Sequence, residues 1–171
     1  FVALNLAGII AFSEKKVIIL DLDMRKPKIH VGFGVPNDKG MSTILINRNS
    51  IDDCIFKSSL NNLDFITAGP VPPNPSELII SSRMLEVIQE LKTKYDVIVI
   101  DNPPVGLVTD GIRVIKMADY PIYVFRENFS KRNFVQNVKK LIRDNNIKNM
   151  SIILNSVDIK RSGYGYSGVY D

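Results

Sequence analysis

The chain has 171 residues, of which 45% are hydrophobic and 23% are charged, and its formal net charge at pH 7 is +4. This length and composition are typical of one soluble globular domain with a core of its own. No apolar run reaches the roughly 18 residues that a membrane span needs, and the modest basic excess late in the chain favours a solvated helix face over a nucleic-acid or anionic membrane surface.

Helical and strand patterns alternate from the first residue. Residues 1–11 are almost all apolar, which predicts a helix that is buried all round. Val17–Asp21 is a β-branched run bounded by charges and predicts a parallel strand covered on both faces. Residues 24–62 show no clear period, so we expect loops with short helices there. Leu63–Thr67 predicts another strand, which Gly69 closes.

A stiff, proline-rich connector, Pro70–Pro73, precedes a predicted helix start. Asn74 can cap this helix, and Pro75 suits its first position. Apolar residues then recur at helical spacing as far as Leu91, so we expect one helix over this range. The remaining expected elements are strands at Val97–Asp101, Pro121–Phe125 and Ser151–Asn155, and helices at Asp110–Met117 and Lys131–Asp144.

The alternation of strand and helix predicts an α/β fold, a doubly wound and mostly parallel sheet with helices on both faces. Residues 1–161 are expected to form this domain. Residues 162–171 are glycine-rich and lack a period, which predicts a flexible tail. Because the chain begins with Phe1 rather than Met, we interpret it as a fragment, a processed product or an incomplete chain.

The single cysteine and the single histidine limit the chemistry that the chain can support. Cys54 has no second cysteine with which to form an internal disulfide, and we expect it to be a small, semi-buried apolar residue. His30 offers little from which to build a histidine metal site or a catalytic triad, and we expect it at the surface or in a loop.

Carboxylates follow two of the predicted strands. Asp21 and Asp23 end the strand at Val17–Asp21, and Asp101 ends the strand at Val97–Asp101. Acidic residues often end strands as turn formers or caps, so the first pair alone is weak evidence. The carboxyl ends of parallel strands are, however, where open α/β sheets bind ligands. Three carboxylates there indicate a divalent metal, held through oxygen and water, beside a nucleotide phosphate.

Four ordered motifs resemble those of the cytoplasmic catalytic domain of bacterial tyrosine kinases, the enzymes of exopolysaccharide and capsule export. They are Asp21-Leu22-Asp23-Met24-Arg25-Lys26-Pro27, Gly40-Met41-Ser42, Gly69 followed by Pro72-Pro73-Asn74-Pro75-Ser76-Glu77-Leu78, and Val97–Asp101 followed by Asn102-Pro103-Pro104. The resemblance covers almost the whole chain. It implies the fold of P-loop NTPases, which is shared with partition-type ATPases.

The resemblance also implies cofactors, ATP and Mg²⁺, and roles for named residues. Asp23 and Asp101 would hold the magnesium ion, largely through water. Asp21 would lie near the γ-phosphate and orient or deprotonate the attacking tyrosine hydroxyl. Arg25 would neutralise phosphate charge, with a salt bridge to a neighbouring carboxylate as the alternative.

Further residues and partners follow from the same resemblance. Asn155, together with Arg126, would contact the nucleotide, although an asparagine there also suits a turn. Tyr164, Tyr166 and Tyr170 would accept phosphate, commonly on a neighbouring subunit of a ring. A membrane polysaccharide co-polymerase or activator region, fused or separate, and a tyrosine phosphatase would be partners, and no nucleic acid is expected. The implied location is the cytoplasmic face of the bacterial inner membrane.

One motif of that family, the phosphate loop G-x-x-x-x-G-K-S/T, does not occur in the 171 residues. We expect the chain to start just after this loop, without the first strand of the sheet. The 171 residues alone would then bind ATP poorly, transfer no phosphate and leave sheet edges unpaired. Two other functions stay open: a partition-type ATPase, and a non-catalytic scaffold subunit of the export machinery.

Overall fold

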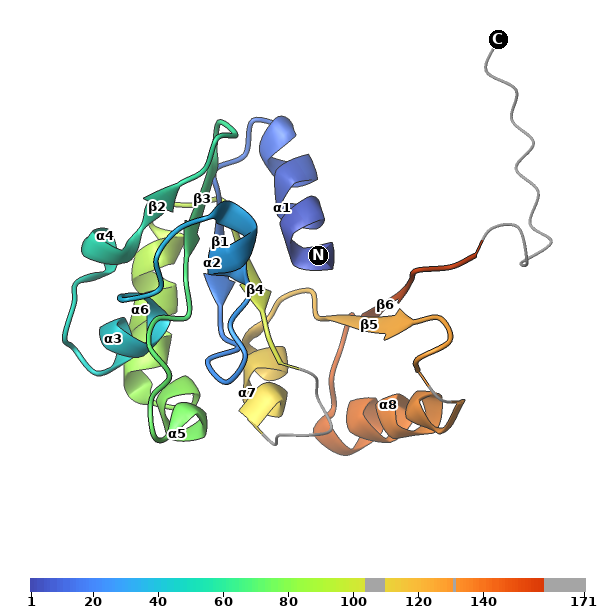
Figure 1. Ribbon diagram of the computed structural model, residues 1–171. Coiled ribbons are helices and arrows are strands. Elements are labelled where there is room, and N and C mark those ends of the chain that lie inside the picture. The colour runs from blue at the N-terminus through green and yellow to red at the C-terminus, as the bar shows by residue number, and fades with distance from the viewer. Residues whose placement is uncertain (104–109, 131, 159–171) are drawn as a thin grey trace, which may run out of the picture. The chain divides into compact units, whose positions relative to one another are not determined.

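The computed structural model describes residues 1–103, 110–130 and 132–158 (Figure 1). The described helices are α1 (Val2–Phe12), α2 (Ile29–Phe33), α3 (Met41–Leu45), α4 (Ile51–Cys54), α5 (Pro75–Ile79), α6 (Ser82–Lys92), α7 (Asp110–Met117) and α8 (Arg132–Asn145). The described strands are β1 (Val17–Asp21), β2 (Phe56–Lys57), β3 (Leu63–Ile66), β4 (Val97–Asp101), β5 (Ile122–Arg126) and β6 (Ser151–Asn155). The tail predicted at 162–171 lies outside the described residues.

The chain divides into two compact units, residues 1–114 and residues 115–171. The first unit contains a four-stranded sheet in the order β2-β3-β1-β4, in which β1 is parallel to both β3 and β4, and β2 is antiparallel to β3. In the second unit, β5 and β6 form a parallel pair, and the chain passes through α8 between them. The predicted α/β architecture with a mostly parallel sheet is confirmed.

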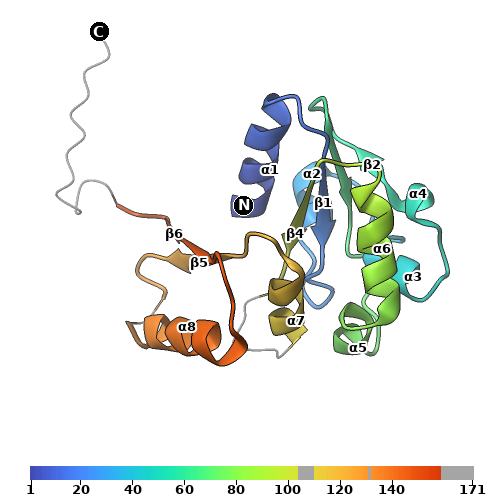
Figure 2. The same ribbon diagram turned by 180° about the vertical axis from the view of Figure 1, so that it is seen from behind.

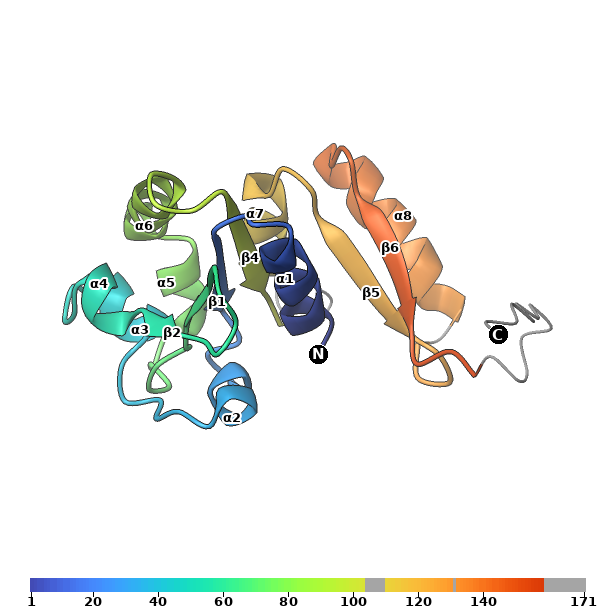
Figure 3. The same cartoon turned by 90° about the horizontal axis from the view of Figure 1, so that it is seen from above.

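Strand β1 is the centre of the first unit. All five of its residues are buried. Val17 and Ile19 belong to a core cluster that includes Ala7 and Ala11 of α1, and the alternation of side chains directs Leu20 to the opposite face, where it is also fully buried. Helix α6 covers that opposite face, as the views from behind and from above show (Figures 2 and 3). The expectation of a strand covered on both faces is therefore confirmed.

Helix α1 corrects one expectation, because it is not buried all round. The side chains of Ile9 and Phe12 are 66% and 75% exposed. The buried stripe consists of the small residues Ala7, Gly8 and Ala11. A helix that lies on one face of a sheet contacts it along a single stripe, whatever residues occupy its other side. Among the described residues, no helix combines the length and the apolar character needed to cross a bilayer.

A second correction concerns the single helix expected between Asn74 and Leu91. The structure has two helices there, because Ser81 ends one and begins the next. The Ser81 hydroxyl donates to the Leu78 carbonyl oxygen at 2.7 Å and accepts a hydrogen bond from the Met84 N–H at 3.3 Å. A serine that binds the backbone in this way competes with helix continuation and favours a cap. The Asn74 side chain makes no bond to the backbone as a cap.

Other expected elements agree with the structure to within one residue at each end. The two-residue strand β2 was not expected, since it is too short to carry an alternating pattern. Cys54 is fully buried in α4 rather than semi-buried, and its thiol lies 3.9 Å from the Thr43 hydroxyl. His30 lies in the short helix α2 and is partly buried.

Candidate active site

Two carboxylates lie side by side where β1 and β4 end. Asp21 and Asp101 are register partners in adjacent parallel strands, so their side chains start from the same face of the sheet. The pairing continues one residue further, because the Leu22 N–H donates to the Asp101 carbonyl oxygen at 2.8 Å. This edge is the carboxyl end of the sheet, at which α/β folds bind their ligands.

The carboxylate of Asp21 organises the loop that follows β1. It is 1% exposed. One oxygen, Oδ1, accepts the Asp23 N–H at 3.0 Å. The other, Oδ2, accepts the N–H groups of Ile29 at 3.2 Å and Lys28 at 3.4 Å. Asp21 therefore fixes both ends of the segment between β1 and α2, which is the turn-forming use of an aspartate at a strand end.

Asp23 and Arg25 are held in the same loop. The Asp23 Oδ1 atom accepts the Lys26 N–H at 3.0 Å, and the residue is half-buried. The Arg25 guanidinium donates through Nη2 to the Ser76 Oγ atom at 2.9 Å. This contact joins the loop after β1 to the first turn of α5, two segments that the sequence alone did not bring together.

Burial sets the protonation of the paired carboxylates. It raises the pKa of Asp21 from 3.8 to about 6; the charge of Asp101 adds to this rise, and the backbone N–H groups oppose it. Burial also raises the pKa of Asp101, and the negative charge of Asp23 adds to that rise. Asp21 and Asp101 are neighbours, so their negative charges disfavour the ionisation of both carboxyl groups at once.

The donor set fits magnesium only in an open, water-rich form. The described part of the chain holds no cluster of three or more His, Cys, Asp or Glu side chains that could enclose a metal ion. Asp21, Asp23 and Asp101 supply only carboxylate oxygens, the hard ligands that Mg²⁺ prefers. Magnesium usually keeps several waters and takes one or two carboxylates plus phosphate oxygens, which matches these residues.

Arg126 and Asn155 come together in the second unit. They are register partners at the carboxyl ends of β5 and β6. The Asn155 Oδ1 atom accepts the N–H of Ser156 at 2.9 Å, and Ser156 has a left-handed backbone with a φ of 60°. Asn155 therefore has the turn-forming contact that the sequence offered as an alternative to nucleotide binding. Tyr164, Tyr166 and Tyr170 lie outside the described residues.

The glycine motifs form a backbone junction, which the sequence did not reveal. The Met41 N–H donates to the Thr67 carbonyl oxygen and the Ser42 N–H to the Ala68 carbonyl oxygen, both at 2.8 Å. A side chain at Gly40 would overlap the carbonyl oxygen of Thr67. The only local signal was the glycine itself, since glycine permits such close backbone approach.

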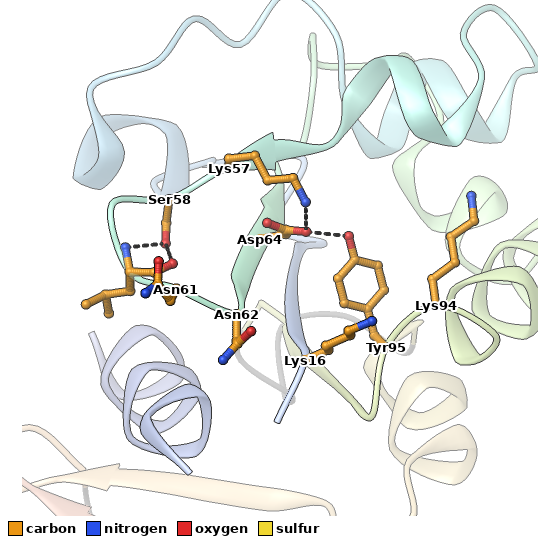
Figure 4. A pocket seen from close by; sticks show the side chains of 9 residues that line it. Lys16, Lys57, Ser58, Asn61, Asn62, Asp64, Lys94 and Tyr95 are labelled. Atoms are coloured by element: carbon orange, nitrogen blue, oxygen red, sulfur yellow. Dashed lines mark hydrogen bonds and ion pairs between the residues drawn. The ribbon is translucent and has the colours of Figure 1, made fainter. Parts of the chain in front are cut away.

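A pocket of about 420 Å³ lies at the opposite, amino-terminal ends of the strands (Figure 4). Its centre is Asp64, whose Oδ2 atom accepts hydrogen bonds from the Tyr95 hydroxyl and the Lys57 ammonium group, each at 2.6 Å. Lys94, another lining residue, is paired with Asp52 at 2.7 Å. Most of the charge in this pocket is therefore compensated within the chain, and the pocket is separate from Asp21 and Asp101.

Comparison with known proteins shows that the chain is similar to bacterial tyrosine kinases. A family model described as an AAA domain matches residues 1–152. The chain is 38% identical over 163 residues to the putative tyrosine-protein kinase CapB of Staphylococcus aureus, which covers 95% of this chain and 72% of CapB. It is also similar to the solved kinase domain of the Escherichia coli tyrosine kinase ETK, with a TM-score of 0.87 and 33% identity over 99% of this chain and 66% of that chain.

A more distant likeness concerns the fold alone. The cell division ATPase MinD of Pyrococcus furiosus is similar with a TM-score of 0.67 and 22% identity, over 88% of this chain and 62% of that chain. The architecture is thus shared by kinases and by other nucleotide-dependent proteins, and the residues at the site must distinguish their functions.

Proposed function

The chain belongs to the AAA-domain family of bacterial tyrosine-protein kinases, and from this premise we propose that the protein phosphorylates itself, by transferring the γ-phosphate of ATP to tyrosine side chains of the same protein. Family membership confirms the resemblance inferred from the four motifs. The observation that carries the proposal is the pairing of Asp21 with Asp101 at the carboxyl edge of the sheet.

The proposed reaction assigns one role to each of the site residues. Asp21 accepts the proton of the attacking tyrosine hydroxyl, and its pKa of about 6 suits a proton acceptor near neutral pH. Asp23 and Asp101 hold magnesium largely through water, and Arg25 neutralises charge on the phosphates. When bound, the magnesium ion would offset the negative charge of the phosphates. Asn155 and Arg126 are proposed contacts of the nucleotide.

The acceptors are proposed to be Tyr164, Tyr166 and Tyr170, in a tail of residues 162–171 that follows a kinase domain of residues 1–161. A tail tyrosine would enter the site of a neighbouring subunit, so a ring of subunits is part of the proposal. The kinase would regulate polymerisation and export of exopolysaccharide or capsule from the cytoplasmic face of the inner membrane. Its proposed partners are a membrane activator region of the co-polymerase type and a tyrosine phosphatase.

The test uses the natural protein that carries this sequence, incubated with Mg-ATP and followed by phosphotyrosine detection and peptide mass spectrometry. We expect phosphate on the tail tyrosines. Asp21→Asn and Asp101→Asn should each slow its appearance by at least about a hundredfold, the usual scale for loss of a catalytic acid–base or metal-binding group.

The matched control is Asp52→Asn, which removes a carboxylate that is 73% exposed and pairs with Lys94. It should keep the wild-type rate. ATP hydrolysis without phosphotyrosine would instead indicate a partition-type ATPase. If the protein catalyses neither reaction and Asp21→Asn leaves polysaccharide output unaffected, the result would indicate a scaffold subunit.

A further inference from the structure

Arg25 and Ser76 join two motifs that are 51 residues apart in the sequence. The guanidinium Nη2 of Arg25 donates to the hydroxyl oxygen of Ser76 at 2.9 Å. Arg25 belongs to the loop that also contains Asp23. Ser76 lies in the first turn of α5, directly after Pro75.

The segment that leads to Ser76 is fixed to the body of the first unit. The side-chain amide of Asn37 makes two hydrogen bonds to the backbone of Gly69. Its Nδ2 group donates to the Gly69 carbonyl oxygen at 2.7 Å, and its Oδ1 atom accepts the Gly69 N–H at 2.8 Å. The Thr67 hydroxyl donates to the Lys39 carbonyl oxygen at 2.8 Å. Beyond Ser76, the side chain of Ile79 is 3% exposed and anchors α5. Ser76 therefore presents its hydroxyl from a rigid support.

The backbone around Arg25 is fixed as well, but its side chain is exposed. Asp23 accepts the Lys26 N–H, which holds the turn on both sides of Arg25. An exposed arginine has several rotatable bonds and loses much side-chain entropy when it is ordered. A hydrogen bond from Nη2 to a fixed acceptor restricts the conformations of the side chain, so part of that entropy is lost before any ligand arrives.

We infer that Ser76 is a positioning residue for phosphoryl transfer, which orients the Arg25 guanidinium towards the phosphates. The inference rests on the proposed function and deepens it, because it assigns a task to the Pro-Pro-Asn-Pro-Ser-Glu motif. Ser76 acts through Arg25 and does not itself touch the reacting atoms. Its loss leaves the charge of Arg25 in place and makes the orientation of that charge less well defined.

The test measures initial rates of phosphotyrosine formation at varied Mg-ATP concentration in the natural protein. Ser76→Ala should lower kcat by about threefold to tenfold, the scale of one partly exposed charged hydrogen bond, and change KM for ATP by less than about twofold. Ser76→Thr keeps a hydroxyl and should restore the wild-type kcat. In an Arg25→Ala background, Ser76→Ala should have no further effect, because the coupled partner is gone.

A structural control comes from the same region. Ser81→Ala removes the cap of α6 and destabilises the chain near Ser76 without touching Arg25. It should leave kcat unchanged at a temperature at which the protein stays folded. Equal losses from Ser81→Ala and Ser76→Ala, an additive effect in the Arg25→Ala background, or failure of Ser76→Thr to restore kcat would each overturn the assignment. A wild-type protein that forms no phosphotyrosine would overturn both the assignment and the proposed function.

Discussion

Asp21 is both a structural acceptor and the proposed proton acceptor, and its pKa connects the two roles. The folded-state pKa of about 6 lies above the ordinary value of 3.8. Between these pH values the folded chain keeps a proton that the unfolded chain has already released. The free energy of unfolding should therefore fall as pH rises from about 4 to about 6 and level off above that, by about 2 to 3 kcal/mol in total for this one group.

Urea denaturation of the wild type and of Asp21→Asn across pH 4 to 7.5 measures this contribution. The variant cannot titrate at this position, so its stability should change less with pH over the same range, whatever its absolute stability. Asp52→Asn, an exposed carboxylate, should keep the wild-type dependence. Parallel pH profiles for the wild type and Asp21→Asn would show that burial of Asp21 does not shift its proton affinity.

The candidate carboxylates could be predicted from the sequence because each follows an apolar run of β-branched residues. The contact between Arg25 and Ser76 could not, since no local pattern in either segment points to the other. The same holds for the two oxygens of Asp21, whose three N–H partners depend on the path of the loop as far as α2. Sequence patterns indicate which strand end carries a residue, and tertiary packing determines what that residue contacts.

At the scale of elements, the junction between α3 and the segment after β3 makes a sharp prediction. Gly40→Ala should destabilise the chain by at least about 2 kcal/mol, because the new methyl group overlaps the Thr67 carbonyl oxygen and the backbone must move. Gly69→Ala should cost a similar amount, since Gly69 has a φ of +79° and its side-chain position meets the Ser42 hydroxyl.

Gly34→Ala is the matched control for these two variants. Gly34 also has a left-handed backbone, with a φ of +66°, but nothing lies within 4 Å of its side-chain position. Gly34→Ala should lower the free energy of unfolding by only about 1 kcal/mol, which is the cost of the left-handed backbone conformation alone. The midpoints of urea denaturation, compared at a constant m-value, give the change in stability for all three variants. If Gly40→Ala proved no more costly than Gly34→Ala, the junction would be looser than its hydrogen bonds indicate.

The elements that the sequence predicted well are those with a clear period or sharp boundaries, such as β1 and α7. The features that the sequence did not predict lack a clear period, sharp boundaries or both. A helix with apolar residues on every side, like α1, has no period from which to infer its buried stripe. The break between α5 and α6 depends on Ser81, a good capping residue that the continuous helical spacing of the apolar residues around it concealed.

At the scale of the whole molecule, the burial of the strands differs between the two units. In the first unit, every residue of β1 is buried and every residue of β4 is partly buried. In the second unit, Ile152 and Leu154 of β6 are each 57% exposed. Each apolar side chain left in water forgoes about 1.5 to 3 kcal/mol of the stabilisation that full burial would give. Total stability is commonly only 5 to 15 kcal/mol, so such losses matter.

We therefore expect the 171-residue chain by itself to melt below about 60 °C, within or below the range of ordinary mesophile domains. Local stability should follow burial, so amide hydrogens of β5 and β6 should exchange well before those of β1. Calorimetry and hydrogen exchange on the same sample test both statements. A single cooperative transition above 60 °C, with equal protection in β1 and β6, would mean that the exposed strands are covered in solution. Protection confined to β1 and its neighbours would locate the stable core in the unit that carries Asp21 and Asp101, and would leave Asn155 on the less stable part of the chain.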